Sequence, residues 1–396
     1  MKRREFLTAA TGGLALSALS YRRVLGASDR LGVALIGSGR RGREVMKAFL
    51  ASGRAELRLV ADVYDVQRQR ARDFLGVTVP ETQAYEEALA RPDVDAVLIG
   101  VPDHLHQSVT LAALAAGKHV YMEKPTTHAL DEGARLIAAV RTSGKVCQTG
   151  TQQRSGAHYA RAKAEYFDTG ALGQVIFVRA AWSDFPWQRR KIAPQPKPAG
   201  LDWDRFIGPA KRVPFDWIRY DSWRYFPDYG GGLLADILTH WVDVAQWFLN
   251  APRPLNAVAT GGIYQLKDGR ENPDTVSAIL QYDGGWNLQF ESSVLPVATP
   301  RPSVFFQGTQ GSLDIARDGY VYRPNTGTPV EVKTAENLEL AHVTSFLDAV
   351  RDGTRPSADI DIGVQACDPI HLARAAYWTR KRMRFDPSGT TIEADV

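Results

Sequence analysis

Three ionisable side chains, Lys124, Asp236 and His240, have sequence contexts that suit proton transfer. Lys124 lies in a Glu-Lys-Pro sequence at 123–125, where its ammonium could hydrogen-bond a hydroxyl that becomes a carbonyl. Asp236 and His240 are four residues apart after the glycines at 230–232, so one helix face would carry both. We expect Asp236 to orient the imidazole of His240, which would take the hydroxyl proton. The structural alternatives are a surface lysine before a proline turn and a buried histidine capped by an acid.

A glycine-rich motif gives the clearest ligand-binding pattern. It follows the apolar stretch 31–36 and opens a helical stretch at 44–49. Gly37 would allow a tight turn, Gly39 a close approach of the backbone to a pyrophosphate, and Gly42 close packing of helix on strand. The free N–H groups at the start of the helix would face the phosphates. The predicted dinucleotide loop consists of Gly37, Ser38, Gly39, Arg40, Arg41 and Gly42.

The acid at the end of the second predicted strand indicates which dinucleotide binds. With that strand at 57–63, Asp65 would accept hydrogen bonds from the adenosine ribose and favour NAD. Asp62 is the alternative if the strand ends earlier. NADP stays open because three nearby arginines would tolerate a 2′-phosphate, namely Arg40, Arg41 and Arg68.

The elements that position these residues form two predicted domains. Short apolar runs alternate with helical stretches from 31 to 149, which predicts a parallel α/β sheet with strands at 31–36, 57–63, 96–101, 119–122 and 146–149. Ligands bind at the carboxyl edge of such a sheet, so we add Pro102, His106, Glu123 and Lys124 to the cofactor site.

The character of the sequence changes after residue 174. Strand patterns at 175–178, 276–282, 286–291 and 303–306 lack intervening helices and predict a mostly antiparallel α+β domain. Residues 185–214 have no clear period and are expected to form a long loop. Helices predicted at 336–351 and 362–381 would close the second domain or pack on the first. We therefore divide the chain into an export signal (1–27), a Rossmann domain (28–150) and a substrate and oligomerisation domain (151–396).

The N-terminus resembles a secretion signal of the twin-arginine type. Lys2, Arg3 and Arg4 precede an apolar stretch at 6–19, which is too short to span a membrane. We expect export to the periplasm and no stable membrane span after cleavage. The first 27 residues carry five of the 48 basic and one of the 44 acidic residues, so the remaining chain is balanced and a nucleic-acid partner is not expected.

Together these motifs resemble the Gfo/Idh/MocA oxidoreductase family. The resemblance covers most of the chain, with matches at 37–42, the strand end at Asp65, 102–106, 123–125, 150–155, 230–240 and 342–351. It implies that Lys124, Asp236 and His240 act at the substrate, with His240 as acid/base, and that the second domain has an open sheet used for homo-oligomer contacts. Leu238 departs from the family pattern, where many relatives have glycine.

The predicted activity is hydride transfer between a sugar or polyol hydroxyl and a tightly held NAD. Substrate contacts are expected from Arg154, Tyr225 and His240, with Trp182, Trp187 and Trp223 as sugar platforms. An exported enzyme meets no evident pool of free NAD. This also suggests an NAD-dependent glycoside hydrolase, which would oxidise the glycoside, eliminate its aglycone, add water and reduce the product again. A zinc hydrolase using His104, His106, Asp236 and His240 is a third possibility, although we predict no metal, and a non-catalytic sensor is a fourth.

Overall fold

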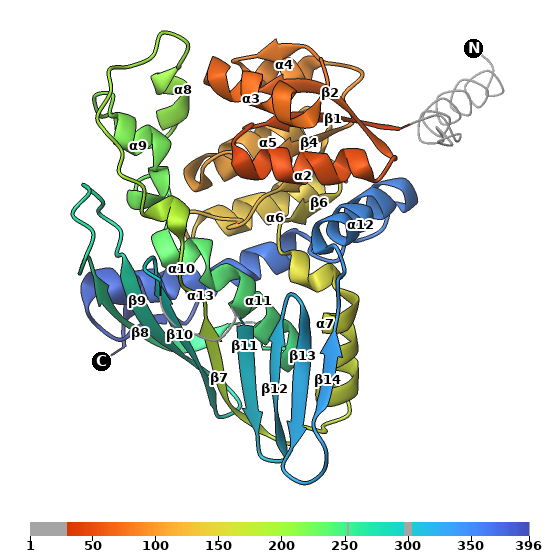
Figure 1. Ribbon diagram of the computed structural model, residues 1–396, viewed down its shortest axis with the longest axis vertical. Coiled ribbons are helices and arrows are strands. Elements are labelled where there is room, and N and C mark those ends of the chain that lie inside the picture. The colour runs from red at the N-terminus through yellow and green to blue at the C-terminus, as the bar shows by residue number, and fades with distance from the viewer. Residues whose placement is uncertain (1–29, 252, 297–302, 396) are drawn as a thin grey trace, which may run out of the picture.

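The computed structural model describes residues 30–251, 253–296 and 303–395. A six-stranded sheet occupies the upper half of Figure 1 and a ten-stranded sheet the lower half, with helices between them. The expected succession of an α/β Rossmann domain and a mostly antiparallel α+β domain is therefore confirmed. The export signal expected over residues 1–27 lies outside the described residues.

The first sheet is parallel, with the strand order β3-β2-β1-β4-β5-β6. Its strands are β1 (Leu31–Ile36), β2 (Ala55–Ala61), β3 (Glu81–Thr82), β4 (Ala96–Ile99), β5 (His119–Met122) and β6 (Cys147–Thr149). The helices around it are α2 (Arg40–Ala51), α3 (Asp65–Leu75), α4 (Tyr85–Ala90), α5 (His106–Ala115) and α6 (Glu132–Ser143). All six residues of β1 are buried, as expected for a strand covered by helices on both faces.

The second sheet has the order β14-β13-β12-β11-β7-β10-β9-β8-β15-β16, and only β7 and β10 pair in parallel. Its strands are β7 (Val175–Ala181), β8 (Pro254–Gly262), β9 (Thr275–Tyr282), β10 (Trp286–Ser293), β11 (Ser303–Gly308), β12 (Gly311–Ala316), β13 (Gly319–Pro324), β14 (Val330–Lys333), β15 (Met383–Phe385) and β16 (Ile392–Ala394). Buried and accessible residues alternate along β7 and β9 because helices cover only one face.

The two C-terminal helices pack differently, the first on the Rossmann domain and the second on both domains. In α12 (Leu338–Asp352), Val343 and Phe346 join the core of the Rossmann domain. In α13 (Ile360–Thr379), Ile370 and Leu372 join the core of the second domain. Other helices of the second half are α7 (Ala157–Ala162), α10 (Gly232–Asp236) and α11 (Leu238–Leu249). Within the described ranges, no helix has the length and apolar character needed to cross a membrane.

Most of the segment expected as a long loop (185–214) belongs to a small folded unit, which we call the strap (residues 186–229). It contains α8 (Trp203–Ile207) and α9 (Trp217–Asp221), which contribute to an aromatic cluster that includes Phe206 and Tyr229. Tyr64 joins this cluster, and the backbone N–H of Asp202 donates to the Val63 carbonyl at 2.9 Å. Aromatic packing thus holds the strap over the end of β2, on the left of Figure 1.

Candidate active site

The glycine-rich loop has the geometry that a dinucleotide requires. Gly37 has φ +83°, and a Cβ there would lie 2.6 Å from the Gly100 carbonyl carbon. A Cβ on Gly42 would lie 2.2 Å from the Gly37 oxygen, whereas one on Gly39 would meet nothing within 4 Å. No side chain caps the start of α2, so its N–H groups are available to a pyrophosphate. The loop therefore fits the phosphates of NAD, with Gly39 facing open space.

Substitution of Gly39 by valine separates binding from folding. We expect the variant to fold, because the added side chain meets open space, and to bind NAD about 100-fold more weakly, a loss of about 3 kcal/mol. Gly42→Val is the comparison, since its side chain meets the Gly37 backbone and should cost several kcal/mol of stability. Calorimetric NAD titration and urea unfolding measure the two effects. Unchanged NAD affinity in Gly39→Val would contradict this assignment.

The acid beside this loop is Asp62, and the expectation for Asp65 is corrected. Strand β2 ends at Ala61, so Asp62 directly follows it and accepts hydrogen bonds from the Ser38 backbone N–H (2.7 Å) and hydroxyl (3.1 Å). Asp65 is instead the first residue of α3 and is exposed. The strand begins and ends two residues earlier than its apolar pattern suggested, because the chain turns at Asp62 where the strap packs.

Lys124 lies just after β5 and is held by Asp236. Its Nζ donates to the Asp236 carboxylate (2.6 Å) and to the Asp236 carbonyl (2.8 Å). Arg224 of the strap binds the other carboxylate oxygen at 3.1 Å. Burial alone would raise the pKa of Asp236, but Lys124 and Arg224 outweigh it and hold the pKa well below its usual value. Asp236 therefore stays ionised and fixes the Lys124 ammonium.

His240 is close to this pair but is not oriented by Asp236 in the way we expected. The predicted single helix is broken at Ile237, so Asp236 ends α10 and His240 lies in the first turn of α11. Both carboxylate oxygens of Asp236 bind cations, and His240 Nδ1 is buried without a hydrogen-bond partner. Leu238 is fully buried in the core, so its departure from the family pattern does not narrow the site.

The charge state of His240 follows from its surroundings. Burial lowers the pKa of His240 well below its ordinary value, and the Lys124, Arg317 and Arg41 cations lower it further. The imidazole is therefore neutral at physiological pH and able to accept a proton. A buried nitrogen without a partner is costly, so a ligand that supplies one would bind favourably there.

Asp103 is a buried acid that the sequence patterns did not single out. It follows Pro102 at the end of β4, is 5% exposed, and accepts a 3.3 Å hydrogen bond from the Gly231 N–H. Burial raises its pKa to about 7, and the nearby Asp236 carboxylate adds to this rise. The positive charges of Arg224 and Lys124 lower this pKa but only partly oppose the rise.

This raised pKa predicts a pH-dependent stability. The folded pKa lies above the unfolded one, so Asp103 stabilises the fold at low pH and this contribution is lost as pH rises through about 7. Asp103→Asn should therefore gain about 2 kcal/mol relative to the wild type between pH 5 and pH 8. Urea unfolding at both pH values measures this, with the exposed Asp73→Asn as control. An equal difference at both pH values would show that Asp103 does not titrate in this range.

Two other residues predicted for the cofactor site, His106 and Glu123, hold neighbouring segments of the chain in place. Both ring nitrogens of His106 face carbonyl oxygens, those of Pro125 (2.6 Å) and Val101 (3.0 Å), so His106 holds the turn after β5 instead of a ligand. Glu123 accepts a 2.8 Å hydrogen bond from Arg41 and anchors the glycine-rich loop. Arg41 also pairs with Glu339 of α12 at 2.6 Å, which ties that helix to the loop.

Two predicted substrate residues have structural partners. Arg154 pairs with the buried Asp243 at 2.8 Å, one turn after His240 in α11. Tyr225 is 2% exposed and its hydroxyl donates to the Gln188 carbonyl at 2.8 Å within the strap, so it has a structural partner there and its contact with the substrate stays a prediction. A tyrosine in an irregular stretch gave no sign that it would be buried.

The residues considered for a zinc hydrolase are not arranged as a set of metal ligands. His106 faces two carbonyls, Asp236 is ion-paired, and His104 Nε2 lies 2.9 Å from the Phe206 carbonyl. Among residues 30–251, 253–296 and 303–395, no group of three or more His, Cys, Asp or Glu is placed to bind a metal ion.

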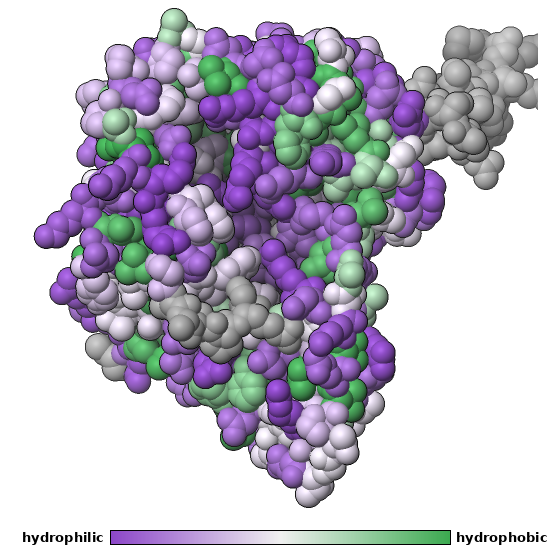
Figure 2. Space-filling model, viewed as in Figure 1, coloured by the Kyte–Doolittle hydropathy of each residue, from purple (hydrophilic) through white to green (hydrophobic). Residues whose placement is uncertain are grey.

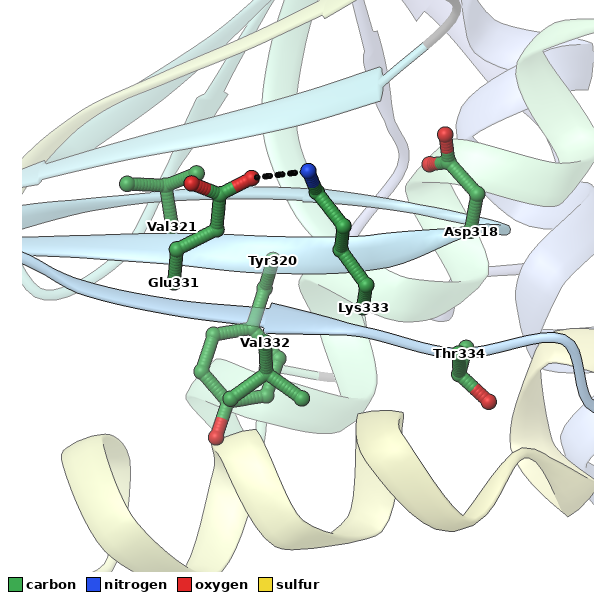
Figure 3. Close-up of a pocket in the computed structure, with 7 residues that line it drawn as sticks. All are labelled: Asp318, Tyr320, Val321, Glu331, Val332, Lys333 and Thr334. Atoms are coloured by element: carbon green, nitrogen blue, oxygen red, sulfur yellow. Dashed lines mark ion pairs between the residues drawn. The ribbon is translucent and has the colours of Figure 1, made fainter.

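The surface in Figure 2 is hollowed and mostly hydrophilic where the two halves of the molecule meet. A separate pocket lies over β13 and β14, where Glu331 and Lys333 form a 3.2 Å ion pair on one side of the strands and Tyr320 lies on the other (Figure 3). None of the residues discussed above lines that pocket. The candidate active site is therefore the one between the two sheets, where Lys124, Asp236 and His240 lie.

Comparison with known sequences agrees with this geometry. A model described as the oxidoreductase family with an NAD-binding Rossmann fold matches residues 31–151, and the GFO/IDH/MocA C-terminal domain matches residues 160–314. A 1,5-anhydro-D-fructose reductase of Ensifer adhaerens is 29% identical over 70% of this chain and 76% of its own. An NAD-dependent scyllo-inositol 2-dehydrogenase of Bacillus subtilis (strain 168) is 27% identical over 83% of this chain and 89% of its own.

Solved structures share the fold. A levoglucosan dehydrogenase in complex with NADH and levoglucosan superposes with a TM-score of 0.70 at 19% identity, covering 90% of this chain and 99% of its own. An aldose-aldose oxidoreductase from Caulobacter crescentus, complexed with glycerol, gives a TM-score of 0.71 at 20% identity, covering 90% and 100%. At these identities the likeness establishes the arrangement of both domains.

Proposed function

Because the chain belongs to the GFO/IDH/MocA family of NAD-dependent oxidoreductases, we propose that it transfers a hydride between NAD and a secondary hydroxyl of a sugar or polyol. The observation that carries this proposal is the Lys124 ammonium, fixed by Asp236 beside the neutral His240 at the edge of the Rossmann sheet. The names of the relatives support the substrate class, since they include an anhydrofructose reductase and an inositol dehydrogenase.

The side chains divide the acid–base work. Lys124 would donate a hydrogen bond to the reacting oxygen, since Asp236 holds its ammonium in place without removing its charge. His240 would take the hydroxyl proton, because burial keeps its imidazole neutral. Trp182, whose ring centroid lies 6.1 Å from that of His240, would offer a face to the C–H groups of a sugar. NAD supplies the hydride acceptor when it is bound.

The test is reduction of NAD by a panel of sugars and polyols. Purified protein with NAD is mixed with each compound, and the absorbance of reduced nicotinamide is followed. We expect reduction by at least one sugar or polyol and none with simple alkanols, which lack the hydroxyls that would position them. A protein that binds NAD but reduces it with no member of the panel would contradict the proposed reaction.

We also propose that NAD is retained between turnovers. The strap packs over the end of β2, and its Trp187 ring lies 4.9 Å from the Arg40 guanidinium at the start of α2. This contact would link the strap to the phosphate-binding loop and so hinder the release of NAD. NAD counted by mass after dialysis and denaturation should be near one per chain, and Trp187→Ala should release it about tenfold faster. An empty dialysed protein would contradict retention but not hydride transfer.

A retained cofactor is compatible with the glycoside-hydrolase alternative as well as with net oxidation. No residue of the site favours the hydrolase, so we keep the oxidoreductase as the proposed function. Nitrophenyl glycosides distinguish the two, because a redox-neutral hydrolase would release nitrophenol continuously without accumulating reduced nicotinamide. Continuous release would overturn net oxidation as the reaction.

We propose export by the twin-arginine route and assembly into a homo-oligomer. Export is supported by the paired arginines near the N-terminus. Assembly is supported by exposed apolar side chains on the outer face of the second sheet, namely Ile176, Leu255, Val258 and Ile279. Cell fractionation tests the first proposal. Sedimentation of the wild type and of Ile279→Glu tests the second, which fails if both are monomeric.

A further inference from the structure

Arg317 stands apart from the other arginines around His240. It lies in the turn between β12 and β13 and is exposed, and its guanidinium lies 4.9 Å from the Trp182 ring centroid. Arg41, Arg154 and Arg224 each pair with a carboxylate, at 2.8, 2.8 and 3.1 Å respectively. Within the described part of the chain, Arg317 has no carboxylate at ion-pair distance. It is a cation whose natural partner would be an anion supplied from outside.

The position of Arg317 connects it to the proposed reaction. Trp182 neighbours both Arg317 and His240, and the ring centroids of Trp182 and His240 are 6.1 Å apart. The Arg317 charge contributes to the lowered pKa of His240, so the two side chains are within electrostatic reach. The protein around Arg317 also removes part of its hydration, which lowers the pKa of the guanidinium. A partly desolvated, unpaired cation is stabilised by binding an anion.

We propose that Arg317 and Trp182 form an anion subsite that selects sugars carrying a carboxylate, such as uronates, over neutral sugars. This inference rests on the proposed function and names its substrate class. The planar guanidinium can bind a carboxylate through two parallel hydrogen bonds, while the Trp182 face packs on the sugar ring. One guanidinium neutralises one charge, which favours a monoanionic carboxylate over a dianionic phosphate.

The experiment compares binding and reduction separately in the NAD-loaded protein. Calorimetry measures the affinities of glucuronate, glucose and glucose 6-phosphate, and absorbance follows NAD reduction by each. We expect the wild type to bind glucuronate at least tenfold more tightly than glucose or glucose 6-phosphate. In R317Q, glucuronate affinity should fall about 30-fold or more while glucose affinity changes less than about threefold.

Two further variants separate charge from geometry. R317K keeps the charge but lacks the planar fork, so glucuronate affinity should fall between those of the wild type and R317Q. R179Q is the matched control, because Arg179 is also exposed and lies 5.7 Å from an aromatic ring, that of Phe305, but on the outer face of β7. Its sugar affinities should match those of the wild type.

Three results would overturn the anion subsite. The first is equal binding of glucuronate and glucose by the wild type, and the second is tighter binding of glucose 6-phosphate than of glucuronate. The third is an R317Q protein that loses NAD affinity without changing the ratio of sugar affinities, because Arg317 would then contact the cofactor. Glucuronate binding that depends on Arg317 supports the subsite even if no sugar reduces NAD, and that failure would count against the proposed reaction alone.

Discussion

Replacement of Lys124 by alanine is expected to lower kcat by about 10²- to 10⁴-fold while NAD stays bound. Asp236 fixes the ammonium of Lys124, so the variant loses the hydrogen bond that this ammonium would donate to the reacting oxygen. Asp236 keeps its ion pair with Arg224, which limits the cost of leaving a buried carboxylate behind. The measurement is the rate at which a sugar substrate reduces bound NAD at saturating concentration.

Lys47→Ala is the control for this experiment. Lys47 belongs to α2 of the same domain, and its ammonium lies 5.4 Å from the Phe74 ring centroid at the surface. Its kcat should match that of the wild type. If Lys124→Ala also kept the wild-type kcat, or if its loss of activity followed a loss of NAD, Lys124 would not act on the substrate oxygen.

His240→Gln is expected to reduce kcat by about 10²- to 10⁴-fold and to change its pH dependence. In the wild type the neutral imidazole persists to low pH, because burial and the surrounding cations lower its pKa. The acid limb of the wild-type profile should therefore lie at a lower pH than an ordinary histidine would give. Without this base, the residual rate should rise about tenfold per pH unit as hydroxide replaces it.

The matched control for His240 is His119→Gln. His119 lies at the start of β5, and its Nδ1 accepts a 3.0 Å hydrogen bond from the Val146 N–H, a role that a glutamine oxygen can fill. Its pH profile should match that of the wild type. A His240→Gln enzyme whose profile keeps the wild-type shape would identify a different residue as the base.

The glycine-rich loop and the elements around it were predictable because their causes are local. Gly37 needs positive φ, Gly42 needs close approach, and β1 is a short apolar run whose six residues are all buried. The antiparallel second sheet was also predictable from its alternating pattern. Periodicity reports which face of an element is buried, and that is a property of the segment itself.

The strap is a segment whose structure local sequence patterns did not predict. Residues 185–214 lack a period because their aromatic residues pack in a cluster contributed by short helices and by Tyr64 of the other domain. That packing buries Tyr225 and accompanies the early end of β2, so the acid beside the loop is Asp62 and not Asp65. The strap meets β2 through contacts such as that of Asp202 with Val63, and Tyr225 is covered by Gln188 and Arg270, so both outcomes depend on residues that lie far apart in the sequence.

The sequence by itself therefore determined the dinucleotide loop, the two sheet types and the identities of Lys124, Asp236 and His240. The tertiary structure decided how these residues are paired. Asp236 binds Lys124 and Arg224 instead of orienting His240, because the helix breaks at Ile237 and two cations reach its carboxylate from other elements. Spacing along a chain fixes which residues can share a helix face, but the partner of a buried charge is chosen by whichever opposite charge the fold brings within reach.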